Sequence, residues 1–451
     1  MIRYFRTQLR RLFVDDTPLI RLFRNAGWLF GGDAVTMGIG VVQGILIARS
    51  LGVEMFGALS LITTYTLFVN QLIDSRVWET VIKYVSQFRT TGDEERVTAV
   101  IKLSYLIDLS TGSLAFLLVL ATSSLAASLF IKDVSLAPLI RLFSLSVLVA
   151  IPQDTSTALL RVNNRFRWLA FQNTFEAVVR FVGVIAVLLL DGGVISLLIV
   201  YLITGAISTI ILLLMVFRIR WEIGLVNLRH ASIRILRPQA REIGKFLLAT
   251  NGNALLKMLR NADVLLLGLL LNPTQVGYYR VARSLTNLMN MPINPIYTTS
   301  YPEFANLWHE GKLFDLKTFV LKILATTTMI AVIGGLVMFF LGEWIIRLSV
   351  GTEYLPALSV LRWLAVGTAV AVATSILRPL LLAAGQATPL ITASILGLFL
   401  QLILFLTLIP VMGLDAAGVA YLGFYSIWVF VCTWAIRQKW KEQTLALAVG
   451  N

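Results

Sequence analysis

The sequence has little of what enzyme and metal sites are usually built from. Its 451 residues include one cysteine and two histidines, and only 14% of them are charged. A single cysteine excludes a disulfide framework. His230 and His309 lie in separate polar segments, which argues against a metal cluster. There is also no Gly-x-x-x-x-Gly-Lys loop for nucleotide hydrolysis. We therefore expect a protein that is not an enzyme, with no catalytic residues, no metal and no cofactor.

Apolar residues are in excess instead. They make up 57% of the chain, whereas soluble domains have about 45–50% apolar and about 25% charged residues. A helix needs roughly 20 apolar residues to cross a bilayer core about 30 Å thick. The apolar runs are continuous and lack the period-two alternation of barrel strands. The predicted fold class is therefore an all-α, polytopic membrane protein with 12 transmembrane helices. These are expected near residues 25–48, 55–80, 99–130, 138–160, 169–190, 194–217, 246–271, 276–301, 318–341, 355–383, 388–410 and 415–436.

The distribution of basic residues predicts the orientation. Because the number of predicted spans is even, both termini lie on the same side of the membrane. The termini and breaks on that side hold 24 Lys and Arg, whereas the other side holds three, Arg49, Lys132 and Arg347. The positive-inside rule places the basic side in the cytoplasm. This asymmetry also explains most of the net charge of +14. We therefore expect contact with anionic membrane lipids and no nucleic-acid partner.

The two halves of the chain resemble each other at an offset of about 220 residues. The stretch 47–57 (IARSLGVEMFG) recurs as 267–277 (LGLLLNPTQVG), each with a span, a tight turn and a glycine that opens the next span. Parallel repeats of this kind place a substrate site between two bundles, near the membrane midplane. We predict two pseudo-symmetric six-helix bundles with flanking segments. The boundaries are an amphipathic segment at 1–24, bundles at 25–217 and 246–436, a basic linker at 218–245 and a cytoplasmic tail at 437–451.

Cations inside the spans are the first candidate site residues. Each ionisable group there costs about 2.5–3.5 kcal/mol, so it is expected to face an interior or a water-filled cavity. Cations outnumber anions within the spans, and an excess of cations in one cavity suits a phosphate or another anion. Pro292 and Pro295 interrupt the eighth span and free carbonyl groups that only a protein-lined cavity tolerates. The candidate cavity cations are Lys257, Arg260, Arg280, Arg283, Arg180 and Arg378.

Carboxylates and amides inside the spans form two further candidate sets, and structural interpretations of them stay open. Glu176 and Arg180 have the i,i+4 spacing of a helical ion pair, and Arg260 with Asp263 could be a second neutralising pair. The amides could join helices rather than contact a ligand. The candidates for ion coupling are Asp33, Asp74 and Asp263, and those for polar cavity lining are Asn25, Gln43, Asn287 and Asn290.

Three stretches carry a family resemblance. They are residues 48–58 (ARSLGVEMFGA), 260–268 (RNADVLLLG) and 275–282 (QVGYYRVA), followed by the segment from Pro292 to Pro302. With the two sets of six spans, they resemble the polysaccharide flippases of the multidrug/oligosaccharidyl-lipid/polysaccharide exporter superfamily. The resemblance covers almost the whole chain and implies a V-shaped pair of helical bundles with a cationic central cavity. It also implies a place in the bacterial cytoplasmic (inner) membrane.

The resemblance implies a function as well. Such proteins move undecaprenyl-diphosphate-linked oligosaccharides from the inner to the outer leaflet, for exopolysaccharide, capsule or O-antigen synthesis. The expected partners are this polyprenyl-diphosphate-linked glycan, membrane lipids and, as further candidates, polysaccharide polymerase and export proteins. Two alternatives stay open. One is a cation-coupled multidrug antiporter of the same superfamily, which would require unpaired carboxylates and few cations in its cavity. The other is a non-transporting membrane component of a glycan assembly complex.

Overall fold

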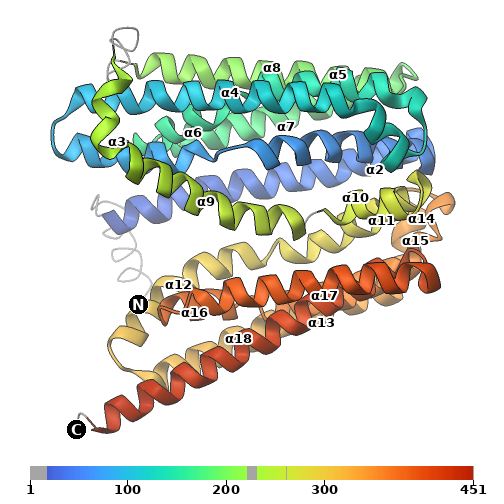
Figure 1. The fold of residues 1–451 in the computed structure, drawn as a ribbon. Coiled ribbons are helices and arrows are strands. Elements are labelled where there is room, and N and C mark those ends of the chain that lie inside the picture. The colour runs from blue at the N-terminus through green and yellow to red at the C-terminus, as the bar shows by residue number, and fades with distance from the viewer. Residues whose placement is uncertain (1–17, 221–230, 261, 450–451) are drawn as a thin grey trace, which may run out of the picture. The chain divides into compact units, whose positions relative to one another are not determined.

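The protein is helical throughout the part of the chain that the structure describes. The computed structural model describes residues 18–220, 231–260 and 262–449. Within these ranges some side chains fall outside the description, namely those of 18–30, 249, 252–257, 259–260, 294–295, 297–299 and 446–449. No strand occurs among the described residues (Figure 1). The first half contains α2 (Pro18–Ile73), α3 (Val77–Thr90), α4 (Glu94–Ala126), η1 (Ala127–Ile131), η2 (Val134–Leu136), α5 (Ala137–Ala150), α6 (Gln153–Val162), α7 (Phe166–Leu189) and α8 (Val194–Arg218).

The second half has more and shorter helices. It contains η4 (Ile233–Gln239), α9 (Ala240–Arg260), α10 (Asp263–Leu270), α11 (Pro273–Asn287), η5 (Leu288–Asn290), α12 (Ile293–His309), α13 (Leu313–Phe340), α14 (Gly342–Ser349), η6 (Thr352–Tyr354), α15 (Ala357–Ala373), α16 (Leu377–Ala383), α17 (Thr388–Met412) and α18 (Asp415–Val449). The predicted N-terminal segment 1–24 and linker 218–245 fall partly outside the described residues.

The all-α membrane fold is confirmed, and the order of helices is consistent with twelve spans. Among the described residues, nine helices are long and apolar enough to cross a membrane. One of them, Gly31–Ile73, contains two predicted spans, because the helical path is interrupted at Gly52 with φ +74°. The predicted seventh and eighth spans are made of shorter helices, α9 with α10 and α11 with α12. Polar residues and prolines make these four segments too short or too polar to stand out by length and hydropathy.

The second predicted span, 55–80, ends earlier than expected. Helix α2 stops at Ile73, and α3 begins at Val77 after a break in which Arg76 adopts a left-handed conformation with φ +45°. The Asp74 carboxylate accepts a hydrogen bond of 3.0 Å from the Arg76 backbone N–H. This local bond competes with the helical ladder, which explains the break.

Contacts divide the chain into two compact units. Unit 1 comprises residues 1–40, 69–121 and 141–254, and unit 2 comprises 41–68, 122–140 and 255–451. Within unit 1, α7 packs on α8, and α6 packs on α3 and α8. Within unit 2, α13, α15, α18 and α17 pack in succession (Figure 1). Each unit also leaves many large apolar side chains exposed, which suits a surface in lipid.

The start of α9 is joined to α3 within unit 1. Lys83 Nζ lies 3.1 Å from Glu242 Oε1, and the Tyr84 hydroxyl donates to the same oxygen at 3.0 Å. The ammonium also lies 4.4 Å from the centroid of the Phe246 ring, and this ring meets Tyr84 edge-on. Ile243 is buried in the core of the same unit. Residues from the end of the predicted linker therefore fold onto unit 1.

We expect the Lys83–Glu242 contact to be pH-dependent. Hydrogen bonds from Lys83 and Tyr84 lower the pKa of Glu242. Burial alone would lower the pKa of Lys83, but its hydrogen bonds to Tyr84 and Glu242 outweigh burial, so the pKa of Lys83 is raised. The stabilisation is thus complete between the ordinary carboxyl and ammonium pKa values, about 4.3 and 10.4. It is lost as the pH falls through the lowered Glu242 pKa or rises through the raised Lys83 pKa.

The check is the thermal midpoint of the purified protein from pH 3 to pH 11. Glu242→Gln should lower the midpoint only between about pH 4 and pH 10. In a Lys83→Met background the same substitution should have a smaller effect, because only the hydrogen bond from Tyr84 is left. An equal loss with and without Lys83 would mean that the pair does not stabilise the fold.

The repeated turn motifs contact each other within unit 2. Gly57 and Gly277 occupy equivalent positions in the two repeats, and both are buried. A Cβ added at Gly57 would lie 1.8 Å from Pro273 O, and a Cβ added at Gly277 would lie 2.3 Å from Val53 O. Pro273 and Val53 are themselves equivalent in the repeat. The contact is therefore reciprocal, as a pseudo-twofold relation between the repeats requires.

Each repeat also supplies a donor to the end of the other repeat's helix. The Tyr354 hydroxyl donates to Ala48 O at 2.8 Å, and Lys132 Nζ donates to Leu269 O at 2.8 Å. Ala48 lies near the end of the part of α2 that precedes Gly52, and Leu269 lies near the end of α10. These two helix ends are equivalent in the repeat, and carbonyls at a helix end lack helical partners. This exchange helps to explain why residues 41–68 and 122–140 group with unit 2.

Candidate functional site

Arg283 is the predicted site residue with the most informative surroundings. It lies on α11 in unit 2, and its guanidinium carbon is 4.1 Å from the centroid of the Tyr421 ring on α18. Asp263, which opens α10 and is 7% exposed, accepts a hydrogen bond from the Tyr279 hydroxyl. Asp263 and Tyr279 are both within electrostatic range of Arg283. Helices α10, α11 and α18 thus bring one carboxylate, two tyrosines and one arginine together.

One N–H of this arginine has no partner. Nη1 of Arg283 is buried and forms no hydrogen bond with any described residue. An unsatisfied buried donor costs about 1–3 kcal/mol, and more when the group is charged. Such a group commonly marks a site that is completed by water, an ion or a ligand. Arg283 therefore carries one enclosed donor that no described residue satisfies.

Arg180 occupies a comparable setting in unit 1. It pairs with Glu176 one helical turn earlier, as the spacing predicted, and lies 5.8 Å from the centroid of the Tyr201 ring. The Ser208 hydroxyl donates to Glu176 Oε2 at 2.6 Å, and Gln172 donates to Ser208. Nε of Arg180 is buried without a hydrogen-bond partner among the described residues. The structural interpretation of this pair is thus supported, although one donor is left over.

We expect Glu176→Ala to destabilise unit 1 by about 1–3 kcal/mol, because it removes a partner from both Arg180 and Ser208. Breaking one side of an ion pair costs more than replacing both sides by apolar groups. The double variant Glu176→Leu/Arg180→Met should therefore recover most of the thermal midpoint lost in Glu176→Ala. Equal midpoints for the wild type and Glu176→Ala would contradict a stabilising role for the pair.

The remaining predicted residues are more dispersed. The side chains of Lys257, Arg260 and Asn25 lie outside the described residues, so their places in a cavity stay predictions. Arg280 and Arg378 are exposed, whereas Asn287 and Asn290 are half-buried at the end of α11 and in η5. Gln43 is buried. The structure thus places Arg283 within electrostatic range of Asp263, and the wider cationic cavity stays a prediction.

The acidic candidates differ in their surroundings. Asp33 is exposed on α2, Asp74 is half-buried at the break before α3, and Asp263 is buried beside Tyr279. No group of three or more His, Cys, Asp or Glu in the described part of the chain is placed to hold a metal ion. Ion coupling by these carboxylates stays a prediction.

Sequence reasoning missed one acidic residue, Asp154 at the start of α6. It lies within electrostatic range of Asp74 and Asp108, and of Arg76 and Arg161. Asp108 accepts hydrogen bonds from the Thr155 hydroxyl and backbone N–H at 2.5 and 3.3 Å. The sequence signal is a carboxylate within the predicted span 138–160. Only folding shows that these carboxylates come from three helical segments of unit 1.

Comparison with known proteins identifies the family. The model of a family described as "Polysaccharide biosynthesis protein" matches residues 22–308, which is more than half of the chain. The chain belongs to this polysaccharide biosynthesis family. A relative is the Inner membrane protein YghQ of Escherichia coli strain K12. It is 21% identical over 353 residues, which cover 76% of this chain and 96% of that protein.

Solved structures confirm the fold of this family member. A multidrug resistance MATE family transporter of the MOP superfamily, in an inward-facing conformation, has a TM-score of 0.76 at 16% identity. The match covers 90% of this chain and 94% of the transporter. The Lipid II flippase MurJ, in an inward closed conformation, has a TM-score of 0.72 at 16% identity, over 92% of this chain and 90% of MurJ. The chain is thus a multi-pass membrane protein with a transporter fold and an inner-membrane homologue.

Proposed function

We propose that this protein moves polyprenyl-diphosphate-linked oligosaccharide repeat units from the inner to the outer leaflet of the cytoplasmic membrane by alternating access. The observation that carries the proposal is the half-buried Arg283, whose buried Nη1 has no hydrogen-bond partner among the described residues. Membership of the polysaccharide biosynthesis family supports a glycan cargo. The likeness of the fold to a lipid II flippase supports a lipid-linked one.

The chemistry of the cargo fits this donor. A diphosphate brings several acceptor oxygens and at least two negative charges, and arginine binds such groups through charge-assisted, often bidentate hydrogen bonds. Bringing that charge into a membrane interior is costly unless cations offset it. Buried neighbours hold the guanidinium of Arg283 in place, because Tyr421 lies against it and Tyr279 holds the nearby Asp263.

Other residues are assigned supporting roles in the same proposal. Both termini lie in the cytoplasm, so the cargo arrives from the basic side of the membrane. The remaining cavity cations in this proposal are Lys257, Arg260, Arg280, Arg180 and Arg378. The carboxylates proposed for ion coupling are Asp33, Asp74 and Asp263. The polar lining of the cavity is assigned to Asn25, Gln43, Asn287 and Asn290.

The test uses a strain lacking this chain. The expected result is loss of the surface polysaccharide and accumulation of the lipid-linked repeat unit, both reversed by the wild-type chain. The strain should show no new drug sensitivity. Drug sensitivity with normal polysaccharide would instead support a multidrug antiporter. Normal lipid-linked intermediates with a polymerisation defect would support a non-transporting component of an assembly complex.

A further inference from the structure

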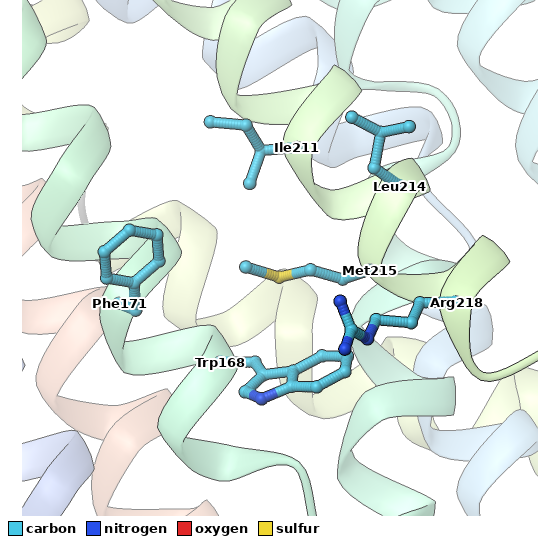
Figure 2. A pocket seen from close by; sticks show the side chains of 6 residues that line it. All are labelled: Trp168, Phe171, Ile211, Leu214, Met215 and Arg218. Atoms are coloured by element: carbon cyan, nitrogen blue, oxygen red, sulfur yellow. The ribbon is translucent and has the colours of Figure 1, made fainter.

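An apolar groove runs along α7 and α8 in unit 1. It has a volume of about 540 Å³ and is lined by Trp168, Phe171, Ile211, Leu214, Met215 and Arg218 (Figure 2). This volume lies within the range of about 300–1,000 Å³ that is usual for ligand sites. Five of the six lining side chains are apolar or aromatic, and Arg218 is the one charged group.

The helical spacing places the charge at one end of the groove. Ile211, Leu214 with Met215, and Arg218 follow each other at intervals of three or four residues, so they share one face of α8. Helix α7 runs antiparallel to α8, because only residues 190–193 connect them. Trp168 near the start of α7 therefore lies at the same end as Arg218 (Figure 2). The groove is thus apolar along its length, with a cation and an indole ring at one end.

Further observations suit a lipid in this groove. Phe171 and Leu214 are 58% and 61% exposed, so the apolar wall is open to the surroundings of the unit. The Arg165 guanidinium lies 5.3 Å from the centroid of the Trp168 ring, which adds a second cation near the charged end. Tryptophan beside basic residues is typical of the headgroup level of a bilayer, and basic pockets between helices on the cytoplasmic side bind anionic headgroups.

A second groove on the other flank of α8 provides a comparison. It has a volume of about 610 Å³ and includes Tyr105, Phe217 and Arg220 in its lining. Here Nη1 of Arg220 donates to Phe217 O at 3.0 Å, and the guanidinium lies 3.8 Å from the centroid of the Phe217 ring. Arg220 is therefore engaged by Phe217 of α8, whereas Arg218 is exposed at the end of its groove.

We propose that the groove between α7 and α8 is a binding site for an anionic phospholipid of the cytoplasmic leaflet. One acyl chain lies along Phe171, Ile211 and Met215, and the phosphate is held by Arg218. Charge complementarity selects the headgroup, since a guanidinium and a phosphate form charge-assisted hydrogen bonds. This site goes beyond the proposed function, because it needs no glycan cargo and is made by unit 1 alone.

The test is native mass spectrometry of the purified full-length chain titrated with phosphatidylglycerol or with phosphatidylcholine of the same acyl chains. The wild type should retain one phosphatidylglycerol with roughly tenfold preference, and Arg218→Ala should remove this preference. Met215→Trp keeps the cation but fills the groove, so it should reduce binding as well. Lys441→Ala is the matched control, because Lys441 is exposed on the same predicted side and lies outside the groove.

Three outcomes would overturn the site. They are equal retention of the two phospholipids by the wild type, unchanged preference in Arg218→Ala, and unchanged phosphatidylglycerol binding in Met215→Trp. Should Arg218→Ala fail to fold, Met215→Trp and Arg218→Lys decide the matter. Arg218→Lys should keep part of the preference, because it keeps the charge but loses the bidentate geometry. Loss of glycan transport with normal lipid retention would count against the proposed function and not against this site.

Discussion

Gly57→Ala should greatly reduce the yield and thermal stability of the folded protein. The new Cβ would lie 1.8 Å from Pro273 O and 3.0 Å from Gly277 N, both backbone atoms that cannot rotate away. Overpacking of this kind typically costs about 1–3 kcal/mol and sometimes more, and a clash with backbone belongs at the upper end. Gly277→Ala should have a similar effect, because its Cβ would lie 2.3 Å from Val53 O. The measurement is the thermal midpoint and the monodisperse fraction in detergent.

Two comparisons make this prediction specific. Gly44→Ala lies on the same helix with no heavy atom within 4 Å of the added Cβ, so it should be neutral or stabilising. The double variant Gly57→Ala/Gly277→Ala should cost less than the sum of the single variants, since the substitutions disrupt one shared contact. Full additivity, or wild-type stability of Gly57→Ala, would contradict the reciprocal crossing of the repeats.

Arg283→Ala should reduce glycan export at least about tenfold while leaving a folded protein. The lost charge-assisted hydrogen bonds to a diphosphate are worth about 1.5–3 kcal/mol, and each 1.4 kcal/mol is a factor of ten. Arg283→Lys should recover only part of the export, because an ammonium keeps the charge but loses the planar fork and the stacking on Tyr421. The measurement is surface polysaccharide per cell, normalised to the amount of protein in the membrane.

Arg347→Ala is the matched control for this substitution. Arg347 is an exposed arginine in an ion pair of 2.7 Å with Glu343, in α14, so its removal should leave export unchanged. The thermal midpoint separates transport from folding, because Arg283→Ala also removes a charge near Asp263. If Arg283→Ala exports normally at normal stability, Arg283 does not bind the cargo.

The features that depend on local sequence were predictable. Apolar run length identified the membrane helices, and the i,i+4 spacing identified the Glu176–Arg180 pair, because both depend on residues close in the chain. The equivalence of Gly57 and Gly277 could also be found from the repeat. Their mutual contact could not, since it depends on how helices far apart in sequence cross.

The features that depend on tertiary packing were not predictable in the same way. The start of α9 appeared as a basic linker, because its charged residues mask the apolar positions around Ile243 that enter the core of unit 1. Lys132 was assigned only to the outer side of the membrane, and its hydrogen bond to Leu269 O depends on tertiary packing. The Arg283 environment needed the fold as well, since Tyr279 and Tyr421 are far apart in sequence and nothing in the local pattern links them.

Movement of a lipid-linked sugar between leaflets tests the central claim most directly. The purified protein would be reconstituted into liposomes with a fluorescent polyprenyl-diphosphate-linked sugar, and a membrane-impermeant quencher would report the fraction exposed outside over time. We predict fast exchange with the wild type and with Arg347→Ala, and exchange no faster than in protein-free liposomes with Arg283→Ala. Wild-type liposomes that exchange no faster than protein-free ones would contradict the flippase account.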